Sequence, residues 1–177
     1  MHYINGSWVT TGSHAFSSLN PATGAPLWQG KAAGETEVAA AVAAAQAAFA
    51  QWAAMTYADR YAIAEQFKRR IEARKDELWR LIAQETGKAP WDAKSEAAAV
   101  IAKLTFAHEA YQERTGTKIK DSPVGRAVVR HRPHGVMAVY GPYNFPAHLP
   151  NGHIMPALLA GNTVVFKPSE QTPMVAE

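Results

Sequence analysis

The pattern of hydrophobic and polar positions changes twice along the chain, from short extended runs to helical spacing and back again. Near the amino end, Asn5-Gly6 is a dipeptide favoured by type I′ turns, and Asn-Pro-Ala-Thr-Gly at 20–24 separates a second pair of extended runs. Two β-hairpins are therefore expected. Apolar residues then recur every three or four positions from about residue 34 to residue 115, which predicts three helices.

Each predicted helix has an apolar face and recognisable ends. The first begins near residue 34, where Glu35 and Glu37 favour the positive end of its dipole. The other two are expected over about 56–87 and 90–115, and Pro90 suits a first helical position. The apolar stripes that should form the core are Val38, Val42, Ala45, Phe49 and Trp52, then Ile63, Phe67, Ile71, Leu78 and Ile82, then Ala97, Val100, Ile101, Leu104 and Tyr111.

Beyond residue 116 the pattern predicts strands again. Residues 118–120 and 127–132 indicate partly exposed strands with basic side chains. The segments 136–140 and 163–166 are continuous apolar runs, typical of strands buried on both faces, and 148–160 between them is predicted to be helical. Such a β-α-β unit requires parallel strands. Because two strands of this kind do not make a stable sheet alone, we expect an unfinished sheet in the front portion of a longer protein.

Composition narrows the class of protein. With 177 residues, of which 47% are hydrophobic and 19% charged, the chain resembles a globular domain and not a disordered or collagen-like chain. No apolar run is long enough to span a membrane and no signal peptide is recognisable, so a cytoplasmic location without a membrane partner is expected. The chain has no cysteine, which excludes a thiolate nucleophile or thiolate metal site within these residues.

The net charge of +3 comes from 18 basic and 15 acidic residues, and the excess gathers between Lys118 and His134. A basic strand there is either a solvated or subunit-contacting surface, or a contact for nucleic acid. Because no aromatic residues are interleaved with its arginines, no nucleic-acid partner is expected. No metal is expected, since His131 and His134 lack helical ligand spacing and His148 and His153 lack acidic companions.

Candidate chemistry lies in the loops that follow the two apolar strands, because ligands bind beyond the carboxyl ends of parallel strands. Asn144 in the first loop offers an amide donor to a developing oxyanion; the alternative is an asparagine that satisfies its own turn. Lys167 and Glu170 in the second loop offer a donor and an acceptor that suit a ribose diol, and the carboxylate would disfavour a 2′-phosphate. The alternative for this pair is an exposed ion pair.

Three consecutive motifs resemble those of the NAD(P)-dependent aldehyde dehydrogenase superfamily. They are Gly-Pro-Tyr-Asn-Phe-Pro at 141–146, Pro-Ala-Leu-Leu-Ala-Gly-Asn-Thr at 156–163 and Phe-Lys-Pro-Ser-Glu-Gln-Thr-Pro at 166–173. The similarity extends to 20–24 and 85–88. Within this superfamily, 130–135 and 148–154 resemble members that oxidise N-succinylglutamate 5-semialdehyde in arginine catabolism.

The resemblance implies residue roles in an NAD-dependent oxidation of an aldehyde to an acid. Asn144 matches the catalytic asparagine that stabilises the oxyanion, and Phe145 and His148 match positions at the substrate entrance, where His148 is a candidate to meet a substrate carboxylate. Positions that match the cofactor-binding segments are Tyr140, Gly141, Pro142, Tyr143, Lys167, Pro168, Ser169 and Glu170. His153 stands where several relatives have a lysine.

The resemblance also implies an α/β fold that is only the N-terminal part of an aldehyde dehydrogenase. Residues 1–116 would form hairpins and a three-helix segment of the cofactor-binding domain, 117–132 strands of the oligomerisation domain of a homo-oligomer, and 133–177 the start of a Rossmann-like parallel sheet. The family's catalytic cysteine and glutamate would lie beyond residue 177, so these residues alone are expected to be inactive. A non-catalytic helical binding or oligomerisation module is the alternative.

Overall fold

The computed structural model describes all 177 residues, and it begins with the two predicted hairpins. The first pairs β1 (His2–Ile4) with β2 (Ser7–Val9), and the second pairs β3 (Ala15–Leu19) with β4 (Pro26–Lys31), both antiparallel. Asn5 and Gly6 have φ angles of 49° and 79°, the left-handed values that a type I′ turn requires at both central positions.

A helical layer follows, and it contains four helices where three were predicted. They are α1 (Glu35–Ala54), α2 (Tyr57–Ala73), α3 (Lys75–Thr86) and α4 (Pro90–Arg114). The predicted second helix breaks at Arg74, whose φ of −106° and ψ of 17° depart from helical values and whose guanidinium binds Glu77 in the first turn of α3 at 2.6 and 2.7 Å. No glycine or proline marks this break, and apolar positions recur at helical spacing across it, so periodicity alone indicates one helix.

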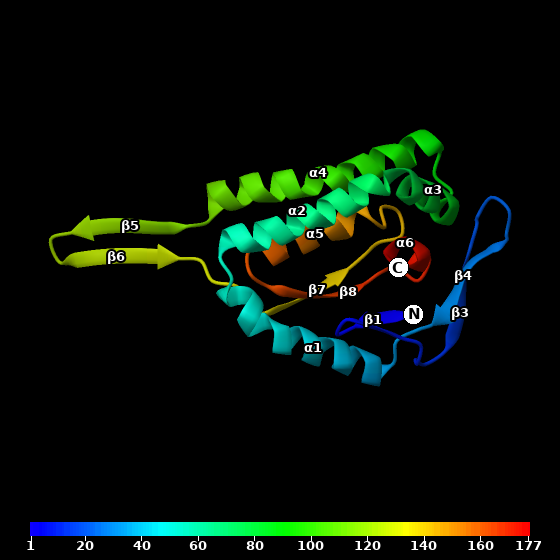
Figure 1. Cartoon of the computed structure of the whole chain (residues 1–177), viewed down its shortest axis with the longest axis horizontal. Helices are drawn as coiled ribbons and strands as arrows, with labels where there is room; N and C mark the ends of the chain where they lie inside the picture. Colours follow the sequence, from blue (N-terminus) through cyan, green and yellow to red (C-terminus); the bar gives the residue numbers. More distant parts are fainter.

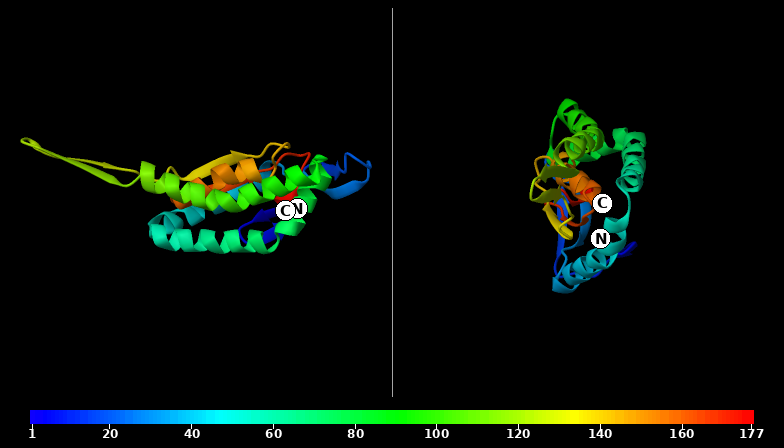
Figure 2. Two further views of the ribbon diagram at one scale, coloured as in Figure 1. Left: turned by 90° about the horizontal axis from the view of Figure 1, so that it is seen from above. Right: turned by 90° about the vertical axis from the view of Figure 1, so that its left-hand side faces the viewer.

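The strands expected beyond residue 116 are β5 (Thr117–Ser122) and β6 (Gly125–Arg130), and they pair as an antiparallel hairpin. Every residue of both strands is exposed, and the hairpin projects as an arm beyond the helices in two perpendicular views (Figures 1 and 2). An isolated two-stranded ribbon of this kind is marginally stable in water.

The next strands form the predicted parallel pair. β7 (Val136–Tyr140) and β8 (Thr163–Lys167) pair in the register Val136 to Thr163 and Tyr140 to Lys167, and α5 (His148–Leu159) connects them. The pair lies between α5 and α1 (Figure 1). Burial on both faces was predicted and is wrong for these residues, since Ala138 and Tyr140 are exposed. Ala138 and Tyr140 are alternate residues and point to the same face, so the rest of the chain leaves this part of one face of β7 uncovered.

Asn162 holds the starts of the two parallel strands together. Its side-chain oxygen accepts from the backbone N–H groups of His134 at 2.6 Å and Gly135 at 3.1 Å, and its amide donates to the Ala157 carbonyl at 3.2 Å. Because Asn162 is buried, these hydrogen bonds satisfy an amide that would otherwise destabilise the fold. The same residue follows Gly161, whose φ of 92° ends α5 where a helix end was predicted.

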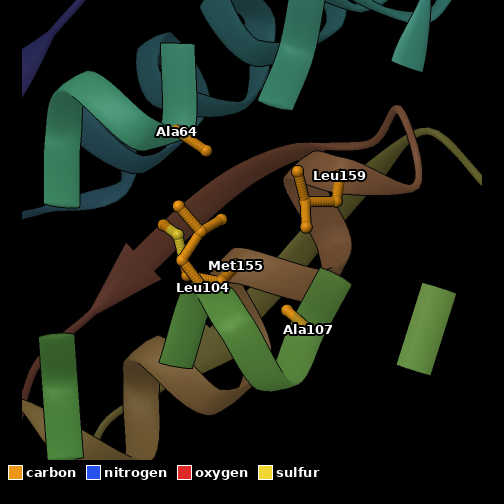
Figure 3. Packing of buried hydrophobic residues seen from close by; sticks show 5 residues of the cluster. All are labelled: Ala64, Leu104, Ala107, Met155 and Leu159. Carbon is orange, nitrogen blue, oxygen red and sulfur yellow. The ribbon is translucent and has the colours of Figure 1, made fainter. Parts of the chain in front are cut away.

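The apolar core lies where α2, α4 and α5 meet. Its five buried residues are Ala64, Leu104, Ala107, Met155 and Leu159 (Figure 3). Arg60 of α2 is buried beside them and donates from Nε to the Leu159 carbonyl at 3.1 Å, at the negative end of α5. A short last helix, α6 (Pro173–Ala176), follows β8. None of the helices has both the length and the apolar character needed to cross a membrane.

Candidate functional site

The loops that follow β7 and β8 lie side by side. The N–H of Gly141 donates to the carbonyl of Lys167 at 2.9 Å, which extends the parallel pairing one residue past the strands. A Cβ at position 141 would lie 2.9 Å from the ring of Phe166 and 3.0 Å from Pro150, closer than side chains approach. Glycine is therefore needed here for the first loop to pack against both elements.

In the second loop, the structure brings Lys167 and Glu170 together. Their Nζ and Oε2 atoms are 3.0 Å apart, and the two side chains are 59% and 69% exposed. Hydrogen bonding, from the backbone N–H of Glu170 itself and from the Lys167 ammonium, lowers the pKa of the Glu170 carboxyl below its ordinary value. A charged donor and a charged acceptor thus stand next to each other in solvent, open to a ligand.

Asn144 lies in the first loop with an exposed side chain. Its amide makes no hydrogen bond within the chain, whereas an asparagine that satisfies its own turn would bond to a nearby backbone group. The rings of Tyr140 and Tyr143 nearby in sequence are 74% and 59% exposed. The amide of Asn144 is therefore free to donate to a bound molecule.

Other candidate residues are used by the fold itself. Ser169 is buried, and its hydroxyl oxygen accepts from the N–H of Gln171 at 3.2 Å, which fixes the turn after β8. Pro142 and Pro168 are half-buried and stiffen the two loops. These three residues shape the loops that carry Asn144 and the Lys167–Glu170 pair.

Glu96 of α4 anchors the first loop, and its role was not anticipated from the sequence. Its side chain is fully buried, and Oε1 accepts from the N–H groups of Ala147 at 3.0 Å and His148 at 3.1 Å. Oε2 binds the ammonium of Lys88 at 2.7 Å, and that ammonium lies 3.4 Å from the centre of the Phe145 ring. A carboxylate in this place satisfies the positive end of α5 and fixes the end of the loop.

Glu85 of α3 performs the same task for α6. Its carboxylate accepts from the N–H groups of Met174 at 2.9 Å and Val175 at 2.8 Å, and from the hydroxyl of Ser18 at 2.6 Å. Both glutamates lie on the apolar stripes of their helices, Glu85 three residues after Ile82 and Glu96 four residues before Val100. A charged residue inside an apolar stripe was the signal that could have identified them, since buried charges are almost always paired.

His148 occupies the start of α5, beside the loop. Its ring meets the Phe145 ring edge to face, with centres 5.9 Å apart, and its Nδ1 atom is buried without a hydrogen-bond partner. Burial lowers the pKa of His148 below its ordinary value, and the positive charges of Lys103 and Lys88 lower it further, while the Glu96 carboxylate opposes them. The imidazole is therefore biased toward its neutral form.

This geometry defines an α/β protein whose candidate site lies beyond the carboxyl ends of two parallel strands. Residues 8–177 match the model of the aldehyde dehydrogenase family. The chain belongs to the aldehyde dehydrogenase family.

Two curated relatives are N-succinylglutamate 5-semialdehyde dehydrogenases. The chain is 54% identical to that of Chromohalobacter salexigens over 174 residues and 55% identical to that of Cronobacter sakazakii over 175 residues. These alignments cover 98% and 99% of this chain but 36% of each relative. The chain thus spans about a third of the length of the curated relatives that it matches.

Solved structures show the same similarity in three dimensions. Succinate-semialdehyde dehydrogenase from Burkholderia pseudomallei superposes with a TM-score of 0.92 at 36% identity, over 98% of this chain and 36% of that one. Aldehyde dehydrogenase from Mycobacterium tuberculosis, complexed with NAD+, superposes with a TM-score of 0.91 at 31% identity, over 98% of this chain and 37% of that one. The predicted fold class is confirmed.

Proposed function

We propose that these residues form the N-terminal, cofactor-side part of an NAD-dependent aldehyde dehydrogenase that oxidises a semialdehyde to a carboxylic acid. The substrate proposed is N-succinylglutamate 5-semialdehyde, because the two curated relatives that bear this name match nearly all of the chain at 54% and 55% identity. The observation that carries the proposal is the junction of the two loops, at which Gly141 donates to Lys167.

The residues at this junction fit a dinucleotide. Lys167 and Glu170 would hold the two hydroxyls of the adenosine ribose, one side chain donating and the other accepting. The negative charge of Glu170 would repel a 2′-phosphate, which favours NAD over NADP. Backbone groups of 140–142 and the exposed ring of Tyr143 would line the cofactor. When bound, NAD supplies the acceptor for the hydride.

Asn144 would stabilise the negative charge that develops on the substrate oxygen. Its amide is exposed and is not used within the chain, so it can donate to that oxygen without first breaking another hydrogen bond. Glu96 acts indirectly, because its hydrogen bonds to Ala147 and His148 hold the end of the same loop. Phe145 and His148 would line the substrate entrance.

The chain itself supplies no cysteine, so the nucleophile of the proposed reaction would come from other residues of the complete protein. The segments 1–116 and 133–177 would belong to the cofactor-binding domain. The arm at 117–132, exposed on both faces, would pair with another copy in a homo-oligomer, because a lone ribbon gains stability when a neighbour covers it.

Initial rates of the complete dehydrogenase that carries these residues test the proposal. N-succinylglutamate 5-semialdehyde with NAD is expected to give a kcat/KM at least about tenfold above that for glutamate semialdehyde with NADP. The 177-residue chain alone, which lacks a thiol, should give no turnover and serves as the blank. A preference for the second pair of reactants would overturn the proposed substrate and cofactor.

A further inference from the structure

A lysine of α4 lies against α5 beside the candidate site without an acidic partner. Lys103 is half-buried, and its ammonium has no carboxylate within 4.0 Å and no hydrogen bond within the chain. The end of its side chain lies beside Gly152, where a Cβ would lie 3.5 Å from Nζ and 3.6 Å from Cε. An ammonium in such surroundings loses hydration and regains little from the protein.

The Lys103 ammonium lies beside Gly152, and Gly152 is on the same face of α5 as His148. The two residues are four apart in the helix, and residues at that spacing are neighbours on one surface. A glycine inside a helix is less favourable than an alanine, because it loses more backbone freedom on folding. Any side chain longer than alanine would compete with the lysine for this space, so glycine leaves room for the ammonium there.

The charges around this place leave a positive excess. Lys88 is paired with the buried Glu96, whose other oxygen is occupied by two backbone N–H groups at the start of α5. Both oxygens of Glu96 are therefore occupied, and no other carboxylate lies within 4.0 Å of the Lys103 ammonium. The groups that act on the His148 ring are Lys103, Lys88 and Glu96, two cations against one anion. The imidazole Nδ1 is also buried without a partner.

We propose that Lys103 and His148, brought together over Gly152, form a binding site for a carboxylate of the substrate at the junction of α4 and α5. This inference rests on the proposed function, since it assigns a binding site to the end of the aldehyde that is remote from the reacting carbon. The ammonium donates to the carboxylate and supplies its counter-charge, and the imidazole donates a second hydrogen bond. Gly152 lies about one helical turn beyond the end of the loop that carries Asn144.

The kinetic test compares a charged and an uncharged aldehyde in the complete dehydrogenase. Lys103→Met keeps the apolar stem and removes the charge; it is expected to raise KM for N-succinylglutamate 5-semialdehyde about tenfold or more. The KM for the dimethyl ester of the same aldehyde should stay within about twofold, and Lys103→Arg should restore most of the affinity for the acid. Lys94→Met, on the exposed side of the same helix, is the matched control. An equal effect on both aldehydes, or none, overturns the proposal.

A second readout does not depend on turnover. In the complete protein, nuclear magnetic resonance of the His148 imidazole should show its pKa rising when N-succinylglutamate binds, because an anion stabilises the imidazolium. The trimethyl ester should cause no shift, and Lys103→Met should weaken the response to the acid about tenfold. No response to the acid overturns the carboxylate site. A response in a protein that oxidises no aldehyde supports the site and overturns the proposed function instead.

Discussion

Replacement of Glu96 by leucine is expected to lower the free energy of unfolding by ~3–5 kcal/mol, the range for removing one partner of a buried ion pair. The carboxylate is fully buried, with three donors within 3.1 Å. Its loss leaves the N–H groups of Ala147 and His148 without acceptors, and leaves Lys88 with Asp92 at 3.8 Å as its nearest remaining carboxylate. Leucine fills the volume but accepts no hydrogen bond.

Denaturant unfolding followed by circular dichroism measures this effect. Glu96→Gln should lose less than Glu96→Leu, because its side-chain oxygen can still accept from one or both N–H groups. Glu77→Leu is the control, since Glu77 is 51% exposed and its bond to Arg74 lies at the surface; a loss below ~1 kcal/mol is expected there. If Glu96→Leu cost no more than Glu77→Leu, the anchoring role of Glu96 would be wrong.

The second large effect is expected from Asn144→Ala in the complete dehydrogenase. Removal of one donor from an oxyanion site lowers kcat by about 10²–10³. The KM should change little, because the interaction is made chiefly in the transition state. The free energy of unfolding should stay within ~0.5 kcal/mol, because the Asn144 amide makes no hydrogen bond within the chain.

Steady-state kinetics and denaturant unfolding of the same preparations separate catalysis from folding. Gln51→Ala, which removes an exposed amide from α1, is the matched control and should leave both quantities unchanged. A kcat for Asn144→Ala within about threefold of the parent enzyme would exclude Asn144 as the oxyanion donor.

Local signals in the sequence were sufficient for much of the fold. Asn5-Gly6 specified a type I′ turn because few other dipeptides adopt two left-handed conformations in succession. Pro90 marked a helix start because its missing N–H costs nothing at the first position. The parallel pairing of β7 and β8 followed from two apolar runs separated by one helix. Such a helix returns the chain to the edge of the sheet where the first strand began, so the second strand runs in the same direction.

Features that depend on distant partners were not predicted. Glu96 binds N–H groups 51 and 52 residues away, and Glu85 binds N–H groups 89 and 90 residues away, so no local pattern identifies the acceptor for each donor. The break at Arg74 was missed for another reason: apolar spacing continues past it, and the only local cause visible is the Arg74 contact with Glu77.

In the candidate site, too, the local features were predicted and a contact between distant residues was not. The sequence placed Asn144 and the Lys167–Glu170 pair on adjacent loops because parallel strands end at one edge of a sheet, and the hydrogen bond from Gly141 to Lys167 agrees with that placement. It did not indicate the ammonium of Lys103 beside Gly152, because this contact joins α4 to α5 across 49 residues and depends on how the two helices pack.

The proposed binding of a dinucleotide at the ends of β7 and β8 is tested most directly by calorimetric titration of the complete dehydrogenase with NAD and NADP. Glu170→Gln removes the charge that would meet the ribose hydroxyls, and we expect the Kd for NAD to rise about tenfold while the preference over NADP shrinks. Glu113→Gln, exposed at the end of α4, should change neither value. An unchanged Kd for NAD and an unchanged preference in Glu170→Gln would contradict this placement of the cofactor.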